Sequence, residues 1–352
     1  MAKPTRTPNG KYRVQVDLGG RRRSGTFETL KLARTGQARM LVEMGSEPVA
    51  LTATIGDLLA DYLDASAGLS ANHLYNARNV VGRLSDSVTD LRASTVSALK
   101  IEAIYRGLLA DGWGAHSVHR FHGILGSAFK RAARYRVIAS NVMATVEAPA
   151  RPSKELHPPT ADDVRKLIGA CTSDLHALTY SLAAATGARR GELVGLRWGD
   201  VDFEAGRISI VRSLAQTPGT AVHETPTKTG AKGHRVITVD PESMALIATR
   251  RAAYPSGEWI LSPTGGIDPW RPAAISRIFP ADMTVAGLSG FRFHDLRHFH
   301  ATQLLTAGVA PWIVARRLGH TNPNTTMRVY SHWIPGTDQA AAEIIARVMR
   351  GN

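Results

Sequence analysis

The sequence predicts an α+β chain that is mainly α-helical and has three parts. These are a small N-terminal β-sheet plus one helix, an all-helical middle unit, and a mostly helical C-terminal unit with a small antiparallel sheet. Apolar residues alternate with polar ones near the N-terminus, recur at three-to-four spacing through 52–146, and form short strand-like runs beyond residue 160. A chain of 352 residues is also too long for one ordinary hydrophobic core and indicates two or three domains.

The N-terminal unit is predicted over residues 1–46. The stretch KYRVQVDL alternates as a half-buried strand does, GGRR makes a turn, RRSGTFET indicates further strands, and LARTGQARMLVEM has helical spacing. Arg21, Arg22 and Arg23 stand at this hairpin and would present a basic sheet edge to a DNA groove. Arginines at a turn are also commonly just solvated, so both interpretations stay open.

Residues 52–146 are predicted to be helical throughout. The helical stretches are TIGDLLADYLDAS, NHLYNARNVVGRL, STVSALKIEAIYRGLLADG and HSVHRFHGILGSAFKRAARYRV. In the last, an inward apolar stripe is formed by Val118, Phe121, Leu125, Phe129 and Ala132. Its C-terminal end carries Lys130, Arg131 and Arg134, which either complement the helix dipole or contact phosphates.

A proline-rich linker is predicted over 147–159, because APARPSKELHPP is polar and lacks periodicity. Thr160 and Asp163 then have the spacing of a helix capping box. The rest of the chain, 160–352, is mostly helical. Strand-like runs at WGDVDF, GRISIVRS and HRVITVD indicate its small antiparallel sheet.

The charge balance points to a polyanionic partner. The chain has 43 Lys+Arg against 29 Asp+Glu, a formal net charge of +14, and a pI near 10.3. Such a protein gains affinity for nucleic acid through counterion release. Because no apolar run is long enough to span a membrane, no signal peptide is recognisable and Cys171 is the single cysteine, we expect a cytoplasmic protein with no membrane partner.

Two stretches carry candidate anion-binding and proton-donating cations. In ATGARRGELVGLRW (185–198), Gly187 and Gly191 flank Arg189 and Arg190 before a helix, a place where a guanidinium can hold a planar anion. In TPTKTGAKGHRVITVD (225–240), Lys228 lies in a predicted β-hairpin. A lysine there can swing onto a ligand and supply a proton if its pKa is lowered.

The stretch FHDLRHFHATQLL (293–305) admits a metal site or a phosphate site. His294 and His298 have the i, i+4 spacing of zinc ligands, but Arg297 lies between them and the glutamate of a zinc helix is missing. On a helix, His294 and Arg297 share a face while Leu296 and Phe299 meet the core. The pattern therefore favours an anion site, and we expect His298 and His300 to be mainly structural.

The last stretch, GVAPWIVARRLGHTNPNTTMRVYSHW (308–333), contains one more short helix. Pro311 suits its first turn, Gly319 its end, and His320 the following loop, with Tyr330 ten residues further on. Read alone, residues 301–333 are also compatible with a helix-turn-helix that enters the major groove of DNA.

Together, TGARRGEL, TKTG, HDLRH and LGHTNPNTTMRVY, in that order, resemble the tyrosine site-specific recombinases, the phage integrases. The resemblance implies that Tyr330 is the nucleophile and that attack links it to a 3′ phosphate. It further implies that the other catalytic residues are Arg189, Arg297, His294, His320 and Lys228. Glu192 would orient Arg189, His294 would accept the tyrosine proton, and Lys228 would protonate the leaving 5′ oxygen. No metal or other cofactor is expected.

The layout also resembles that family and implies a role for each part. Residues 1–46 would bind arm-type DNA sites, 52–146 would bind core-type sites, 147–159 would link them to a catalytic domain, and 160–352 would form that domain. The expected partners are double-stranded DNA, three further copies of the chain in a homotetramer, and accessory DNA-bending or directionality proteins. The expected task is integration or excision of a mobile element in a bacterial or phage-infected cell.

Three other functions compete with this one. A type IB topoisomerase-like strand transferase would use the same chemistry, but the arm-like unit at 1–46 favours the integrase. A non-catalytic helix-turn-helix regulator would have no need of Arg189, Lys228, His294 and Tyr330 together. A metal-dependent nuclease fits least well, because Arg297 stands between the two histidines with ligand spacing.

Overall fold

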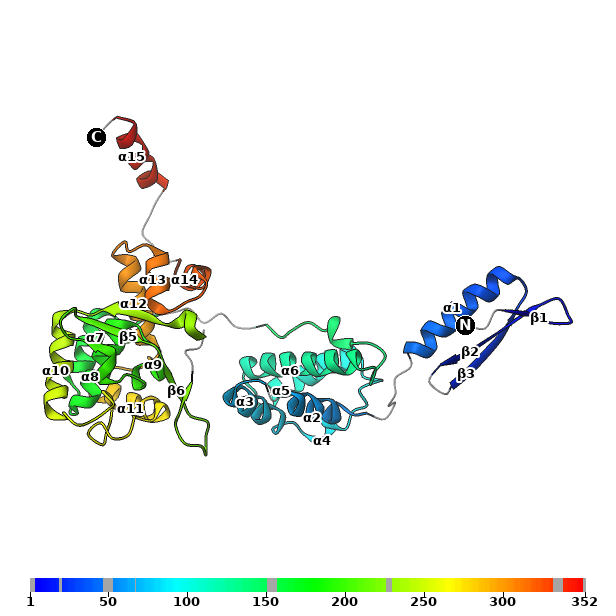
Figure 1. Ribbon diagram of the computed structural model, residues 1–352, viewed down its shortest axis with the longest axis horizontal. Coiled ribbons are helices and arrows are strands. Elements are labelled where there is room, and N and C mark those ends of the chain that lie inside the picture. Colours follow the sequence, from blue (N-terminus) through cyan, green and yellow to red (C-terminus); the bar gives the residue numbers. More distant parts are fainter. Residues whose placement is uncertain are drawn as a thin grey trace. The chain divides into compact units, whose positions relative to one another are not determined.

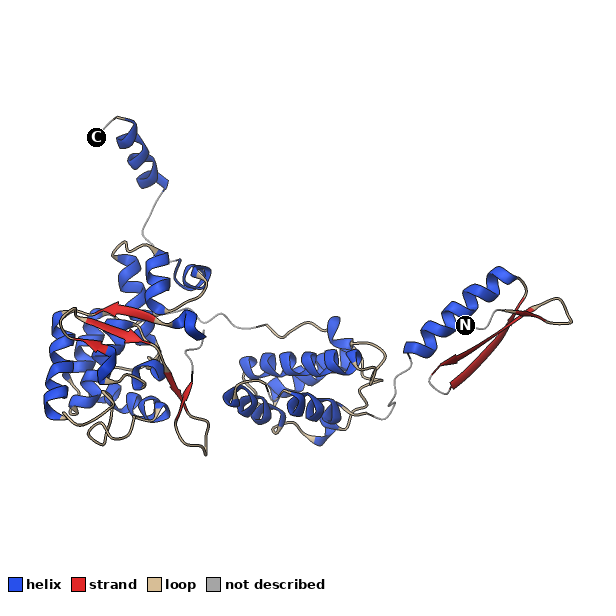
Figure 2. Cartoon of the chain, in the orientation of Figure 1, coloured by secondary structure: helices blue, strands red, loops and turns tan. Residues whose placement is uncertain are grey.

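The computed structural model describes residues 4–18, 21–46, 53–66, 68–150, 157–225, 230–331 and 338–350. The chain divides into two compact units, Met1–Lys154 and Glu155–Asn352. The described residues are mostly helical, with small antiparallel sheets (Figures 1 and 2). The predicted α+β, mainly α class is confirmed. None of the helices described is both long and apolar enough to cross a membrane.

The N-terminal part is an antiparallel sheet with one helix packed on it. Its strands are β1 (Thr5–Arg6), β2 (Tyr12–Leu18) and β3 (Arg21–Phe27), in the order β1-β2-β3, and α1 (Leu30–Ser46) packs on β2 and β3. Val14 and Val16 are buried beside Ala33 of the helix. The alternation in the sequence therefore predicted the inward face of β2 correctly.

The three arginines open strand β3. Arg22 is the cross-strand partner of Asp17, and its Nε lies 2.8 Å from Asp17 Oδ1 in an exposed ion pair. Arg23 is also exposed, while the side chain of Arg21 lies outside the described residues. Part of the positive charge predicted for this edge is thus balanced by Asp17, because the strand register places the two side chains opposite one another.

The rest of this unit is a helical bundle around α6. Its helices are α2 (Ile55–Ala65), α3 (Ala71–Val81), α4 (Asp86–Thr89), α5 (Ala98–Ala110), α6 (Ala115–Arg134) and the 3₁₀ turn η1 (Val142–Ala144). The predicted stripe of α6 is confirmed, since all five of its residues are buried. The helix expected from residue 94 begins only at Ala98, because the Ser97 side chain accepts from the amide of Lys100 and caps it there.

The basic end of α6 is partly used for packing. Arg131 Nε donates to Asp61 Oδ2 of α2 at 2.6 Å, and its guanidinium also lies over the Tyr135 ring. Arg131 therefore has a structural partner within the bundle, whereas Lys130 and Arg134 are exposed to solvent.

The C-terminal unit places helices around two small sheets. The helices are α7 (Ala161–Gly169), α8 (Asp174–Thr186), α9 (Arg190–Val194), α10 (Pro241–Ala253), α11 (Pro272–Val285), α12 (Asp295–Thr306), α13 (Pro311–Leu318), α14 (Pro323–Tyr330) and α15 (Asp338–Met349), with 3₁₀ turns η2 (Trp198–Asp200) and η3 (Gly230–Gly233). The predicted capping box is confirmed: Thr160 Oγ1 accepts from the amide of Asp163, and Asp163 Oδ2 accepts from the amide of Thr160.

The strands form two separate antiparallel sheets. One has the order β4-β5-β8, from β4 (Val201–Asp202), β5 (Arg207–Ile210) and β8 (Arg235–Thr238). The other pairs β6 (Ser213–Ala215) with β7 (His223–Thr225). The prediction of a single β-hairpin over 225–240 is wrong, because the turn between Thr217 and Thr220 closes β7 onto β6 while β8 pairs with β5. Lys228 lies outside the described residues.

Two apolar cores support this unit. The larger one joins α7, α8, the sheet of β5 and β8, and α10 to α12. The smaller one lies between α12, α13 and α14 and consists of Ala301, Leu305, Val314, Leu318 and Tyr330. Leu296 is buried in the larger core and Phe299 packs against it, as the helical spacing predicted. Tyr330, the predicted nucleophile, belongs to the smaller core.

Candidate active site

Arg297, in the first turns of α12, is the most enclosed cation of the site. It is only 4% exposed and donates from Nη1 to Gly187 O at 2.7 Å and from Nη2 to Leu318 O at 2.8 Å. The same Nη2 lies 2.9 Å from His320 Nε2. Burial, followed by the charge of Arg189, lowers the pKa of Arg297 to about 9, so it stays cationic at neutral pH.

The loop after α8 has to turn sharply to meet this arginine. Gly187 ends α8 in the left-handed region with φ +61°, and a Cβ there would come within 2.6 Å of His300 Cδ2. Glycine is therefore required for both the backbone conformation and the space. The turn directs its carbonyl to Arg297 and leads into Arg189.

Arg189 lies at the N-cap of α9 and is held by Glu192. Its Nη1 donates to Glu192 Oε1 at 3.0 Å, its backbone amide to Oε2 at 2.8 Å, and its Nη2 to Gly319 O at 3.5 Å. The Arg189 side chain is 23% exposed, whereas that of Glu192 is 1% exposed. The arrangement matches the predicted orienting contact, with part of the guanidinium left open to solvent.

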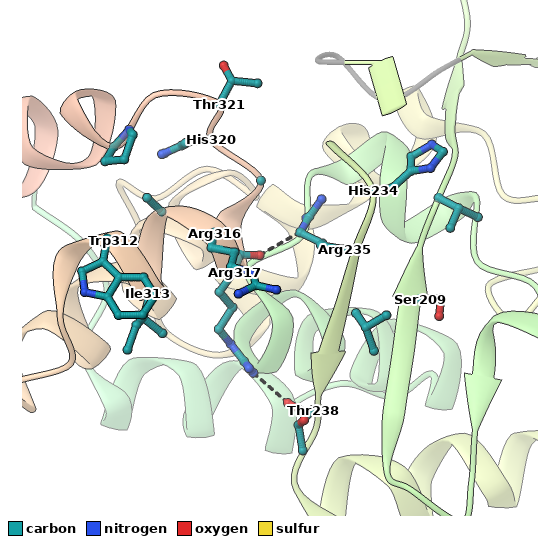
Figure 3. A pocket seen from close by; sticks show the side chains of 15 residues that line it. Ser209, His234, Arg235, Thr238, Trp312, Ile313, Arg316, Arg317, His320 and Thr321 are labelled. Carbon is teal, nitrogen blue, oxygen red and sulfur yellow. Dashed lines mark hydrogen bonds between the residues drawn. The ribbon is translucent and has the colours of Figure 1, made fainter. Parts of the chain in front are cut away.

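Arg235 was missed by the sequence reasoning. This buried residue of β8 donates from Nε to Arg317 O at 2.7 Å (Figure 3). It also donates from Nη2 to Glu192 Oε2 at 2.7 Å and from Nη1 to Gly233 O at 3.1 Å. A signal was present, since Arg235, Ile237 and Val239 share the buried face of a strand. A charge on such a face requires a buried partner.

Glu192 remains ionised in these surroundings. Burial alone would raise its pKa, but the hydrogen bond and charge of Arg235, with those of Arg189, hold the pKa below its usual value. The carboxylate of Glu192 thus connects α9 with β8 through Arg235, and Arg235 connects β8 with the end of α13 through Arg317 O.

His320 follows α13, whose ends are as predicted. Pro311 is its first residue, and Gly319 ends it with φ +70°. Because Arg297 can only donate, His320 Nε2 must accept, and its Nδ1 therefore carries the hydrogen and donates to Thr326 Oγ1 at 2.8 Å. Burial, then the charges of Arg297 and Arg189, lower the pKa of His320 to about 4, so the ring is neutral at pH 7.

Tyr330 is the last residue of α14 and is 2% exposed. Its Oη lies 2.7 Å from His298 Nδ1. Burial raises the pKa of Tyr330 to about 12, although the positive charge of Arg297 acts in the opposite direction. The packing of α14 on α12 thus places the tyrosine oxygen beside the ring of His298, and the structural role expected for His298 stays a prediction.

The other two histidines of α12 differ in setting. His294 is the exposed N-cap residue, and its ring packs edge-on against that of His298 at 5.2 Å. His300 is buried, with Nδ1 2.8 Å from Ala184 O and with Nε2 accepting from Arg317 Nε at 3.0 Å. The placement of His300 agrees with the structural role that its apolar neighbours indicated.

The structure thus brings most of the predicted residues together around one cationic cluster. Arg297 contacts His320, and Arg297 and Arg189 donate to the successive carbonyls of Leu318 and Gly319 at the end of α13. Tyr330 of α14 contacts His298, the residue after Arg297. A groove beside them runs between β8 and α13, with His320 and Arg235 on its wall (Figure 3). Within the described ranges, no group of three or more His, Cys, Asp or Glu residues is placed to hold a metal ion.

Comparison with known proteins identifies the family. Residues 160–335 match the phage integrase family. The chain belongs to this family. It is similar to a XerC-like tyrosine recombinase of Caldanaerobacter subterraneus (24% identity, 98% of this chain and 99% of the relative) and to the ICEBs1 integrase of Bacillus subtilis (24%, 95% and 96%). The chain is therefore a tyrosine recombinase, an enzyme of site-specific DNA recombination, as the four motifs implied.

Solved structures share the fold. The Tn1549 transposon integrase in complex with a circular intermediate DNA superposes with a TM-score of 0.74 at 17% identity, covering 84% of this chain and 99% of that one. The lambda integrase tetramer bound to a Holliday junction gives 0.63 at 20% identity, covering 96% and 97%. Both of these structural neighbours are integrases bound to DNA.

Proposed function

We propose that this recombinase cuts and rejoins DNA through a 3′-phosphotyrosine on Tyr330 and thereby integrates or excises a mobile element. The observation that supports the proposal most is the cluster of Arg189, Arg297 and His320 next to the buried phenol. A phosphodiester bound there would meet two guanidinium groups, and the buried carboxylate of Glu192, which holds Arg189, is already paired with Arg235 as well.

The arginines would act on the charge that develops during attack. Nucleophilic attack on the phosphorus of a phosphodiester increases the negative charge on the non-bridging oxygens, and fixed N–H donors stabilise it without reorganisation. Arg189 offers the more exposed guanidinium, and Arg297 adds a buried cation whose orientation is fixed by two carbonyls. These residues provide the positive charge for binding and for the transition state.

Covalent capture explains how strands can be exchanged. Attack by Tyr330 Oη on the phosphorus forms the Tyr–O–P bond and breaks the P–O5′ bond, and Lys228 would give its proton to the leaving 5′ oxygen. The phosphotyrosine keeps the energy of the broken bond, so a 5′ hydroxyl from another duplex can reverse the step without ATP. His294, exposed at the start of α12, would contact the bound phosphate.

The remaining parts would bind DNA and organise the assembly. Residues 1–46 would take arm-type sites, 52–146 core-type sites, and 147–159 would link these to the catalytic domain 160–352. Synapsis of two sites requires four protomers, for which the lambda integrase tetramer is the example, and accessory DNA-bending or directionality proteins would act with them. The reaction would take place on DNA in the cytoplasm of a bacterial or phage-infected cell.

The chemistry is tested with a suicide duplex. The binding site is first selected from a random-sequence library with the inactive Tyr330→Phe variant, and a nick is placed so that cleavage releases a short fragment. The wild type should form a covalent protein–DNA adduct that survives EDTA, and Tyr330→Phe should form none. A chelator-sensitive product with free ends would instead indicate a nuclease, and no adduct under any condition would indicate a regulator.

The arm-domain assignment is tested by removing residues 1–46. The shortened protein should bind the selected core duplex with unchanged affinity and lose binding to a second, arm-type sequence. In a separate assay of the wild type, relaxation of supercoiled DNA without any preference for the selected site would favour the topoisomerase-like alternative. Unchanged binding to every sequence would contradict the role given to 1–46.

A further inference from the structure

His298 makes the contact that bears most directly on the reacting atom. It follows the buried Arg297 on α12, and its Nδ1 lies 2.7 Å from Tyr330 Oη, with the two ring centroids 5.6 Å apart. The backbone of α12 is fixed on this side by the bonds of Arg297 to Gly187 O and Leu318 O. The position of the imidazole is therefore defined by the same element that holds the central arginine.

The protonation states allow transfer in one direction. Burial lowers the pKa of His298; Asp295 raises it and Arg292 and Arg297 lower it, while His294 and Tyr330 complete the titratable surroundings. Because burial also raises the pKa of Tyr330 to about 12, both groups are neutral at pH 7. In the tautomer whose Nδ1 carries no hydrogen, the phenol donates to Nδ1, and this is the arrangement from which the proton can be transferred.

We propose, on the basis of the function proposed above, that His298 is the catalytic base that takes the proton of Tyr330 during attack. Tyr330 Oη forms its bond to phosphorus while its proton moves to His298 Nδ1, and the P–O5′ bond breaks as the 5′ oxygen receives a proton from Lys228. In the rejoining step the incoming 5′ hydroxyl returns a proton to Lys228, and His298 returns its proton to the departing phenol. Every proton is accounted for, and no co-reactant is needed.

This assignment differs from the one that the family resemblance implied, in which His294 accepts the proton. His294 is exposed at the start of the helix and packs edge-on against His298. In this proposal the two rings have different roles: His298 accepts the proton of the nucleophile, and His294 contacts the bound phosphate. A purely structural role for His298, in which it only fixes the position of Tyr330, is the alternative to be tested.

The test separates proton transfer from positioning. His298→Asn places an amide oxygen near the position of Nδ1, which can still accept a hydrogen bond from Tyr330 but cannot take its proton. Each form is also made with 3,5-difluorotyrosine at position 330, whose phenol ionises at lower pH and depends less on a base. Single-turnover adduct formation is measured on the nicked suicide duplex, with His294→Gln as the matched control.

We expect His298→Asn to slow adduct formation by roughly 10²–10⁴-fold, the usual contribution of a general base. Difluorotyrosine should recover at least about tenfold of this loss in His298→Asn and should change the wild type and His294→Gln much less. The rate of wild-type adduct formation should also be less sensitive to pH than that of His298→Asn, whose phenol must ionise on its own.

Two results would overturn the inference. One is an unchanged rate in His298→Asn; the other is a reduced rate that difluorotyrosine fails to rescue while folding and DNA binding stay intact. If His298→Asn does not fold, His298→Gln is used in the same comparison. Absence of a Tyr330-dependent adduct in the wild type would refute the proposed function itself, whereas a wild-type adduct with an unaffected variant refutes only the role of His298.

Discussion

The ion pair between Glu192 and Arg235 supports both the stability and the activity of the C-terminal unit. The side chains are 1% and 5% exposed, with Oε2 and Nη2 2.7 Å apart. Removing one partner leaves the other charge buried, which costs about 3–5 kcal/mol. For a unit of this size, Glu192→Gln or Arg235→Met alone should lower the melting temperature by roughly 6–20 °C.

The double variant Glu192→Gln/Arg235→Met should lose less than the sum of the single losses. Neither charge remains, but Arg317 O and Gly233 O lose their donor, so recovery is incomplete. We expect a coupling of about 1–3 kcal/mol in the double-mutant cycle. Adduct formation should be low in Glu192→Gln and stay low in the double variant, because Arg189 is no longer held by a carboxylate in either.

Urea unfolding in a Trp113→Phe background measures this, since the remaining tryptophans all lie in the C-terminal unit. Arg250→Met is the matched control: Arg250 donates to the carbonyls of Ile260 and Ser262, so it should destabilise without coupling to Glu192. Strict additivity of the two substitutions, or recovery of cleavage in the double variant, would refute the reasoning.

Three further outcomes are expected. Arg297→Lys should reduce adduct formation at least about 100-fold with little change in DNA binding. The reason is that an ammonium cannot reach Gly187 O, Leu318 O and His320 in one fixed plane. Gel-shift and adduct assays on the same duplex check this. Gly187→Ala should destabilise by more than about 1 kcal/mol in urea unfolding, since φ is +61° and the new Cβ would meet His300. Stability should fall as pH drops from about 6.5 toward 4, because burial lowers the pKa values of His300 and His320 to about 4 and the unfolded chain therefore takes up protons first. Urea unfolding midpoints measured across this range should fall less steeply in His320→Gln than in the wild type.

The features that the sequence predicts well are local ones. The stripe of α6, the Thr160–Asp163 capping box, and the limits of α13 at Pro311 and Gly319 depend on residues within a few positions of each other. Backbone geometry and helical periodicity are enough to place them. The charge of the site also followed from composition and motif alone.

What escaped prediction depends on contacts between distant segments. Periodicity placed His298 near the side of His294, but only the packing of α14, some thirty residues later, puts the Tyr330 oxygen on its ring. The partner of Arg235 is 43 residues away, on α9. The β-hairpin predicted over 225–240 failed for the same reason. Strand β8 pairs with β5 and not with β7, which is nearer in the sequence, because strand pairing is decided by the packing of whole sheets.

The concentration of arginines in the site is made possible by the ends of helices. Arg297 donates to the terminal carbonyls of α8 and α13, Arg235 to Arg317 O, and Arg189 to Gly319 O. Helix C-termini carry partial negative charge, so these carbonyls offset the mutual repulsion of the cations. Carboxylates would do the same but would also compete with a phosphate. The left-handed glycines that end both helices direct these carbonyls inward, so the backbone conformation at Gly187 and Gly319 is as much a part of the site as the side chains that bind there.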